Sequence, residues 1–149
     1  MAQFARPDAD TNNVDAYTDQ AGGSTSLFAT IDETSASDAD YIRTVASPSN
    51  DVIVFRLSDV TDPVSSANHV MRVRSATDVA SGGETLDLTC QLRQSYVNEG
   101  SPGTLIATLT RTGFSGTTWT DTSYTLSGAE ADAITDYTAL FYRILINRP

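Results

Sequence analysis

The stretch TLDLTCQLRQ, residues 85–94, has the most regular alternation of apolar and polar residues in the chain. One side of an extended backbone over this stretch would carry Leu86, Leu88, Cys90 and Leu92, and the other would carry Asp87, Thr89, Gln91 and Arg93. Successive side chains of a β-strand point to opposite faces of the sheet. A period of two therefore predicts a strand with one buried face.

Similar short runs lie on both sides of this strand. They are expected at residues 26–31, 40–45, 51–57, 69–76, 104–112, 118–126 and 138–147. The segments between them are rich in Asp, Ser, Asn and Pro, which favour turns because they hydrogen-bond the local backbone or restrict it. No helix alternates regularly with the strands. About eight short strands in this arrangement predict an all-β fold, an antiparallel jelly-roll β-sandwich.

One short helix is expected just before the last strand, over residues 128–134. Ser127 and Glu130 fit the S-x-x-E capping box, in which two side chains satisfy free backbone donors at a helix start. The strand at 138–147 then has apolar residues on both faces, as in a strand covered on both sides. We expect either the N-terminal segment or a neighbouring subunit to cover its second face.

The first 25 residues contain few large apolar side chains, namely Phe4, Val14 and Tyr17. A segment of this kind cannot bury enough surface to fold alone. It is expected to be a coil, an extended arm or a weak first strand. The simplest division of the chain is an extended N-terminal arm over residues 1–25 and a jelly-roll domain over residues 26–149.

Charge and composition make some classes of binding partner unfavourable. The 149 residues carry a net charge of −10, and all nine basic residues are arginine. An acidic protein repels phosphate backbones and anionic lipids, so neither nucleic acid nor a membrane is an expected partner. The chain has neither a run of roughly 18 apolar residues nor a secretory signal, so we expect a soluble protein made in the cytoplasm.

The sequence offers no recognisable catalytic or metal-binding set. His69 is the only histidine and Cys90 the only cysteine, which is too few ligands for zinc and leaves a Ser-His-Asp triad without support. The run DADTNNVDAYTD, residues 8–19, resembles the start of a calcium loop but lacks the glycine at position six and the terminal glutamate. We therefore expect a protein that is not an enzyme and has no metal or other cofactor.

Five segments resemble small jelly-roll proteins of tailed bacteriophages, a group that includes cement, or capsid-decoration, proteins. They are ARPDAD (5–10), LFATIDETSASDADYIRT (27–44), LSDVTDPVSSANHVMRVR (57–74), LTCQLRQ (88–94) and LSGAEADAITDYTALFYRI (126–144). The resemblance implies a structural protein of the virion that is made in the host cytoplasm and binds the outer surface of the capsid. It also implies that the protein holds major capsid proteins together as a homo-oligomer, either a trimer or a dimer.

Candidate binding residues follow from this interpretation. Contacts to the partner are expected from Phe4, Arg6, Tyr17, Arg72, Arg74 and Arg148. An alternative function is a carbohydrate-binding jelly roll on a phage head or tail component. It would use Phe114 and Trp119, because flat aromatic rings stack on sugars. Phe114 is expected to be the best exposed ring, in a Gly-Phe-Ser-Gly turn, whereas core packing is the more frequent role for a residue such as Trp119.

Overall fold

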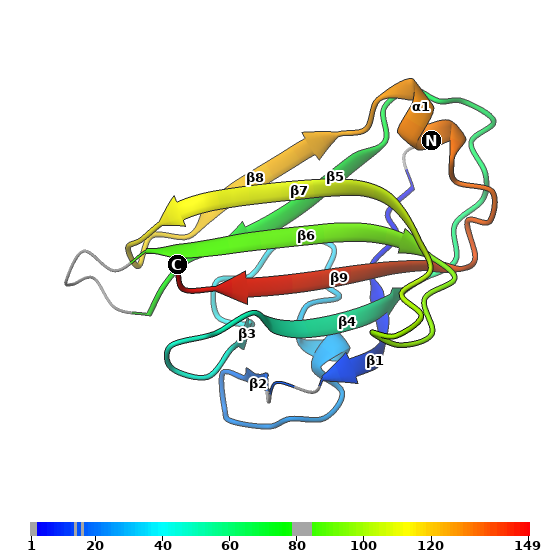
Figure 1. The fold of residues 1–149 in the computed structure, drawn as a ribbon. Coiled ribbons are helices and arrows are strands. Elements are labelled where there is room, and N and C mark those ends of the chain that lie inside the picture. The colour runs from blue at the N-terminus through cyan, green and yellow to red at the C-terminus, as the bar shows by residue number, and fades with distance from the viewer. Residues whose placement is uncertain (1–2, 14, 16, 79–84) are drawn as a thin grey trace.

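A five-stranded antiparallel sheet forms the main body of the computed structural model, which describes residues 3–13, 15, 17–78 and 85–149. Its strands lie in the order β1-β4-β9-β6-β7 (Figure 1). Their bounds are β1 Pro7–Asn13, β4 Asp51–Leu57, β9 Leu140–Asn147, β6 Leu86–Gln94 and β7 Thr104–Phe114. The strand at the centre, β9, pairs with both β4 and β6.

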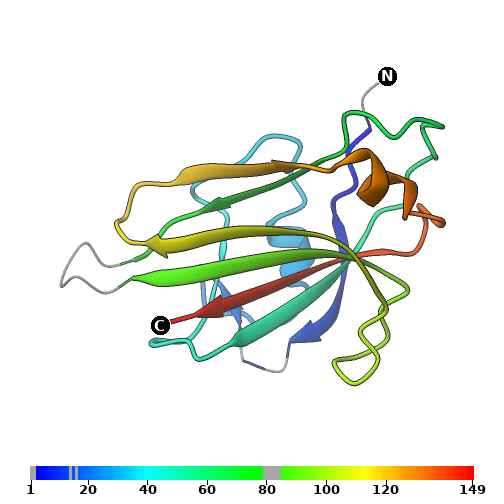
Figure 2. The ribbon, with the colours of Figure 1, turned by 45° about the horizontal axis from the view of Figure 1, so that its top comes forward.

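Two smaller sheets complete the fold. Strands β5 (Val70–Ser75) and β8 (Thr120–Thr125) form one antiparallel pair, and β2 (Thr18–Asp19) and β3 (Ile42–Arg43) form the other. The turn between β7 and β8 joins the five-stranded sheet to the pair β5–β8, and the short helix α1 (Gly128–Asp132) lies near the far end of β8 (Figure 2). The prediction of an all-β, antiparallel fold with one short helix before the last strand is confirmed.

The antiparallel pairs are nested along the chain. The innermost pair is β6 with β7, the next is β5 with β8, and the outermost is β4 with β9. An eight-stranded jelly roll has two full sheets facing each other. Here the pair β5–β8 is much narrower than the five-stranded sheet, so the jelly-roll topology stays a prediction.

The hydrophobic core lies between the inner face of the five-stranded sheet and the elements that cover it. From the sheet come alternate residues such as Ile53, Phe55, Cys90 and Leu109, each at most 2% exposed. The pair β5–β8 contributes Met71, Val73 and Tyr124, and the region of α1 contributes Ala131 and Ile134. The alternation of the 85–94 stretch is thus used as predicted, with its apolar side in the core.

The strand predicted at residues 26–31 is wrong. This segment forms a 3-10 helix, η1 (Leu27–Thr30), whose Leu27 is fully buried. The carboxylate of Asp10 accepts hydrogen bonds from the backbone N–H groups of Leu27 and Phe28, each at 2.8 Å. These two donors at the start of a helical turn have no partner within the turn itself, so a side chain from β1 fixes the segment in the helical form. The strand predicted at 40–45 is reduced to Ile42–Arg43.

Of the three alternatives for the N-terminal segment, the structure shows a first strand. Residues 7–13 pair along β4, with two irregularities in register. The extended arm expected over residues 1–25 is therefore replaced, from Pro7 to Asn13, by an edge strand of the sheet. Strand pairing satisfies the polar backbone of a segment that has little apolar surface of its own.

The second face of β9 is partly covered by the chain itself. Tyr96, which follows β6, is 4% exposed and packs on Val52 and Val54 of β4, with Phe141 and Leu145 of β9 beside it. The segment between β6 and β7 supplies part of the cover expected from an N-terminal arm or a neighbouring subunit. Phe141 and Leu145 are half-buried, so a contact with a neighbouring subunit stays a prediction. This segment, residues 95–103, is called the outer loop below.

Candidate interaction site

The N-terminal residues are fixed to the segment that follows β4. The side chain of Gln3 donates to the carbonyl of Thr61 at 2.8 Å and accepts from the N–H of Thr61 at 2.7 Å. Closer to β1, the backbone of Arg6 accepts from the N–H of Ser58 at 2.7 Å and donates to its hydroxyl at 3.1 Å. Residues 3–6 are therefore held at both ends before the first strand begins.

Phe4 lies between these two anchors and has 60% of its surface exposed. The guanidinium of Arg6 sits over the Phe4 ring, 5.1 Å from the ring centroid, which is within the range of a cation–π contact. The structure thus brings together two of the residues predicted to contact a partner. An exposed aromatic ring held beside an arginine has the composition that is enriched in the centres of protein interfaces.

A hollow of about 480 Å³ lies next to this segment and includes Gln3 in its wall. The other wall residues come from 59–62 and 135–138, and three of them are the acids Asp59, Asp62 and Asp136. Hydrogen bonds from the hydroxyl and the backbone N–H of Thr138 hold the pKa of Asp136 below its usual range. Asp59 forms an ion pair with Arg56 at 2.5 Å. The other two acids of the wall, Asp62 and Asp136, have no ion pair among the described residues, so the wall has an excess of acidic groups.

Tyr137 connects this hollow with His69, the single histidine of the sequence. Its hydroxyl lies 2.8 Å from Nε2 of His69, and the Nδ1 atom of His69 is buried without a hydrogen-bond partner in the described part of the chain. Burial raises the pKa of Tyr137, and the nearby carboxylates of Asp62 and Asp132 raise it further. His69 is thus a hydrogen-bond partner of the wall residue Tyr137, and no carboxylate among the described residues is shown bound to it.

The other predicted contact residues lie elsewhere. Tyr17 is only 1% exposed, and its hydroxyl donates to the carbonyl of Asp51 at 2.9 Å, so it is a core residue and its predicted role at a surface is wrong. Arg74 binds Asp38 at 2.6 Å and Asp121 at 3.2 Å. Arg72 is exposed on the same strand, β5. Arg148 donates to the hydroxyl of Ser47 at 3.1 Å and follows β9.

The two rings of the predicted sugar site do not form one platform. Phe114 is the last residue of β7 and is 6% exposed, with the guanidinium of Arg111 4.4 Å from its ring centroid. Its expected exposure in a turn is wrong because the strand continues through it and turns the ring into the core. Trp119 is half-buried beside Tyr41, with ring centroids 5.6 Å apart and a tilt of 51°.

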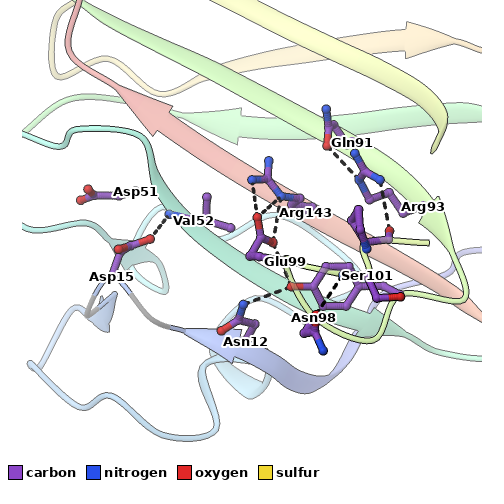
Figure 3. A network of polar contacts seen from close by, with 12 residues as sticks. Asn12, Asp15, Asp51, Val52, Gln91, Arg93, Asn98, Glu99, Ser101 and Arg143 are labelled. Atoms are coloured by element: carbon purple, nitrogen blue, oxygen red, sulfur yellow. Dashed lines mark hydrogen bonds and ion pairs between the residues drawn. The ribbon is translucent and has the colours of Figure 1, made fainter. Parts of the chain in front are cut away.

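A polar network that was not predicted from the sequence lies on the outer face of the main sheet (Figure 3). The hydroxyl of Tyr96 donates to Glu99 at 2.9 Å and accepts from the side chain of Asn12 at 3.1 Å. Glu99 also binds Arg143 of β9. On the next strand, Arg93 donates to Gln91 and to the carbonyl of Pro102 at 3.1 Å. The network joins β1, β9, β6 and the outer loop, so it has no local signal in the sequence.

Neither a metal centre nor a membrane-spanning helix is found among residues 3–13, 15, 17–78 and 85–149. No three His, Cys, Asp or Glu side chains in these ranges are arranged to hold an ion. The helices within the same ranges are too short and too polar to cross a bilayer.

Comparison with known proteins gives no relative. No family model matches the chain, and neither the curated proteins nor the solved structures contain a match. The class of protein is therefore defined by its fold alone, an antiparallel β-sandwich with an anchored N-terminal segment.

Proposed function

We propose that this protein is a non-enzymatic structural protein of a tailed-phage virion, a capsid cement protein that binds the outer surface of the head. The observation that carries the proposal is the exposed Phe4 ring, 60% accessible and stacked with Arg6 on a segment fixed at both ends. Since residues 3–6 are already ordered, binding through Phe4 would lose little conformational entropy. The sequence resemblance described above supports the choice of a phage capsid as the partner.

The charge of the protein supports a protein partner on the outside of a shell. A net charge of −10 opposes contact with packaged DNA, whereas the acidic wall beside Phe4 favours a basic patch on major capsid proteins. Because the protein would bind the assembled lattice and not free subunits, it would stabilise the assembled state by mass action.

A point variant tests this role better than a truncation. Removing residues 1–25 would delete β1 and Tyr17 from the fold, so loss of binding would say nothing about contacts. Phe4→Ala removes one exposed ring and leaves the anchors at Gln3 and Arg6 in place. We expect it to weaken binding to capsids that lack this protein by about tenfold or more, as for a central interface residue.

The matched control is Val97→Ala, because Val97 is exposed to a similar degree, 66%, but lies in the outer loop. Binding would be measured by co-sedimentation, and the heat resistance of the decorated shells by light scattering. Wild-type protein that ignores such capsids would overturn the capsid role. Equal binding by Phe4→Ala and Val97→Ala would remove the N-terminal segment from the interface.

A further inference from the structure

The two edges of the main sheet are protected to very different degrees. Edge strand β1 begins with Pro7, has two irregularities in register and lies against η1 through Asp10. A proline, bulges and a covering segment are the usual features that prevent an edge from pairing with another chain. The β1 edge is therefore closed to further strands.

Strand β7 forms the other edge and contains no proline. It is 11 residues long, and its only strand partner in the described part of the chain is β6. Over residues 104–112, the backbone groups that point away from β6 have no hydrogen-bond partner among the described residues. Its pairing with β6 has register irregularities between Leu105 and Ala107 and between Arg111 and Phe114, and is regular from Ala107 to Arg111. An unpaired edge with a regular central segment is a template for another strand.

The composition of β7 fits a second copy of the same chain. Residues 104–110, TLIATLT, carry no charge, in a protein whose net charge is −10. Two copies that approach by most other surfaces bring acidic groups together, whereas two β7 edges meet without like charges. Thr104, Leu105 and Thr110 are exposed on this strand, and Leu105 is 47% accessible.

We propose that the protein forms a two-fold symmetric dimer in which β7 pairs antiparallel with β7 of a second copy, centred on Thr108. Because Thr108 lies opposite Thr108 of the second copy, the two residues of every opposed pair point to the same side of the sheet in their own chains. Ala107 would lie opposite Leu109 on the core side of both sheets, and Thr108 opposite Thr108 on the outer side. The two five-stranded sheets would then become continuous. The single charge of the strand, Arg111, falls outside the central segment and far from its symmetry mate.

The proposed dimer specifies the homo-oligomer that is part of the proposed function, and it rests on the proposed function for that homo-oligomer. It is tested on the purified protein without capsids, so its failure and the failure of the capsid role are distinguishable. A chain that dimerises but ignores capsids keeps the dimer and loses the capsid role. A chain that binds capsids as a monomer keeps the capsid role and loses the dimer.

The first experiment is light scattering coupled to size exclusion over a range of concentrations. We expect a dimer for the wild-type chain. Thr108→Lys places two ammonium groups directly opposite each other across the proposed axis and should raise the dimer dissociation constant by about tenfold or more. Thr89→Lys puts the same charge on the same face of neighbouring strand β6, one strand further from the axis, and should leave the dimer intact.

The second experiment fixes the register. Residues opposite each other in antiparallel strands have Cα atoms about 4.5–5.5 Å apart, within the span of a disulfide. Thr108→Cys should therefore form a covalent dimer on mild oxidation. The native Cys90 should not contribute, because it is fully buried and burial raises the pKa of its thiol to about 12.

Circular dichroism would establish that each variant is folded. A monomeric wild-type chain would overturn the proposal. So would a dimer that Thr108→Lys leaves unchanged, or one that Thr108→Cys fails to link.

Discussion

The guanidinium of Arg143 donates two hydrogen bonds to the carboxylate of Glu99, from Nη2 to Oε2 at 2.7 Å and from Nε to Oε1 at 3.1 Å. Arg143 belongs to the central strand β9 and Glu99 to the outer loop, so this pair holds the loop on the sheet. Arg143→Gln should lower the free energy of unfolding by about 1 kcal/mol, since the Glu99 side chain is 39% exposed and screened by water. Arg72→Gln, on exposed β5, should change it by less than about 0.5 kcal/mol in the same urea titration. Equal effects of the two variants would contradict the role of the pair.

The same pair predicts a pH dependence. The hydrogen bonds from Arg143 hold the pKa of Glu99 below its ordinary value of 4.5. A carboxylate with a lowered pKa in the folded state stabilises the fold at pH values above its unfolded pKa. This contribution is lost as the pH falls below 4.5 and through the folded pKa. The stability difference between wild type and Arg143→Gln should therefore shrink between pH 6 and pH 3, and a constant difference would count against the ion pair.

Gly103, at the end of the outer loop, has a φ of +67°. A Cβ atom there would collide with the carbonyl of Gln94 and the backbone of Ser95. Gly103→Ala combines this collision with a left-handed backbone and should cost more than about 2 kcal/mol. Gly113→Ala is the matched control, because Gly113 has a φ of +61° but open space at its Cβ position. It should cost about 1 kcal/mol, so similar losses for the two variants would show that the collision is relieved.

Tyr17→Phe tests the anchoring of the N-terminal region in the core. The variant keeps the ring and removes the buried hydroxyl that donates to the carbonyl of Asp51. It should lower the free energy of unfolding by about 1 kcal/mol, because the carbonyl loses a partner in a site that water does not reach. Tyr41→Phe removes a hydroxyl with no bond in the described part of the chain and should be nearly neutral. A neutral Tyr17→Phe would show that the hydroxyl bond adds nothing to stability.

The strands of the main sheet were predictable because their signal is local. Alternation within 85–94 reports which side of β6 is buried, and the structure uses this side as expected. Residues 51–57 form a strand as expected, but Val52 and Val54 are buried on its second face as well. The capping box at Ser127 and Glu130 is likewise formed as predicted, since both partners lie within one turn.

The wrong predictions share a physical cause. Each concerns a segment whose structure depends on a residue far away in the sequence. Residues 26–31 have the composition of a strand, but the carboxylate of Asp10 selects a helical turn. Tyr96 covers the outer face by packing on Val52 and Val54 and by its hydrogen bond with Asn12, and no local pattern connects these residues to it. Glycines close to Phe114 on both sides predict a turn there, yet β7 extends through Gly113.

The position of β9 in the sheet has a consequence for synthesis. This strand follows all the other described strands in the sequence, yet it lies between β4 and β6. Until residues 140–147 leave the ribosome, β4 and β6 have no neighbour on their facing sides, and the sheet cannot close. The nascent chain therefore exposes two additional pairing edges for as long as translation of the segment from β6 to β9 takes, a few seconds at about 5–20 residues per second. The main sheet is therefore completed only when its central strand, β9, inserts between β4 and β6.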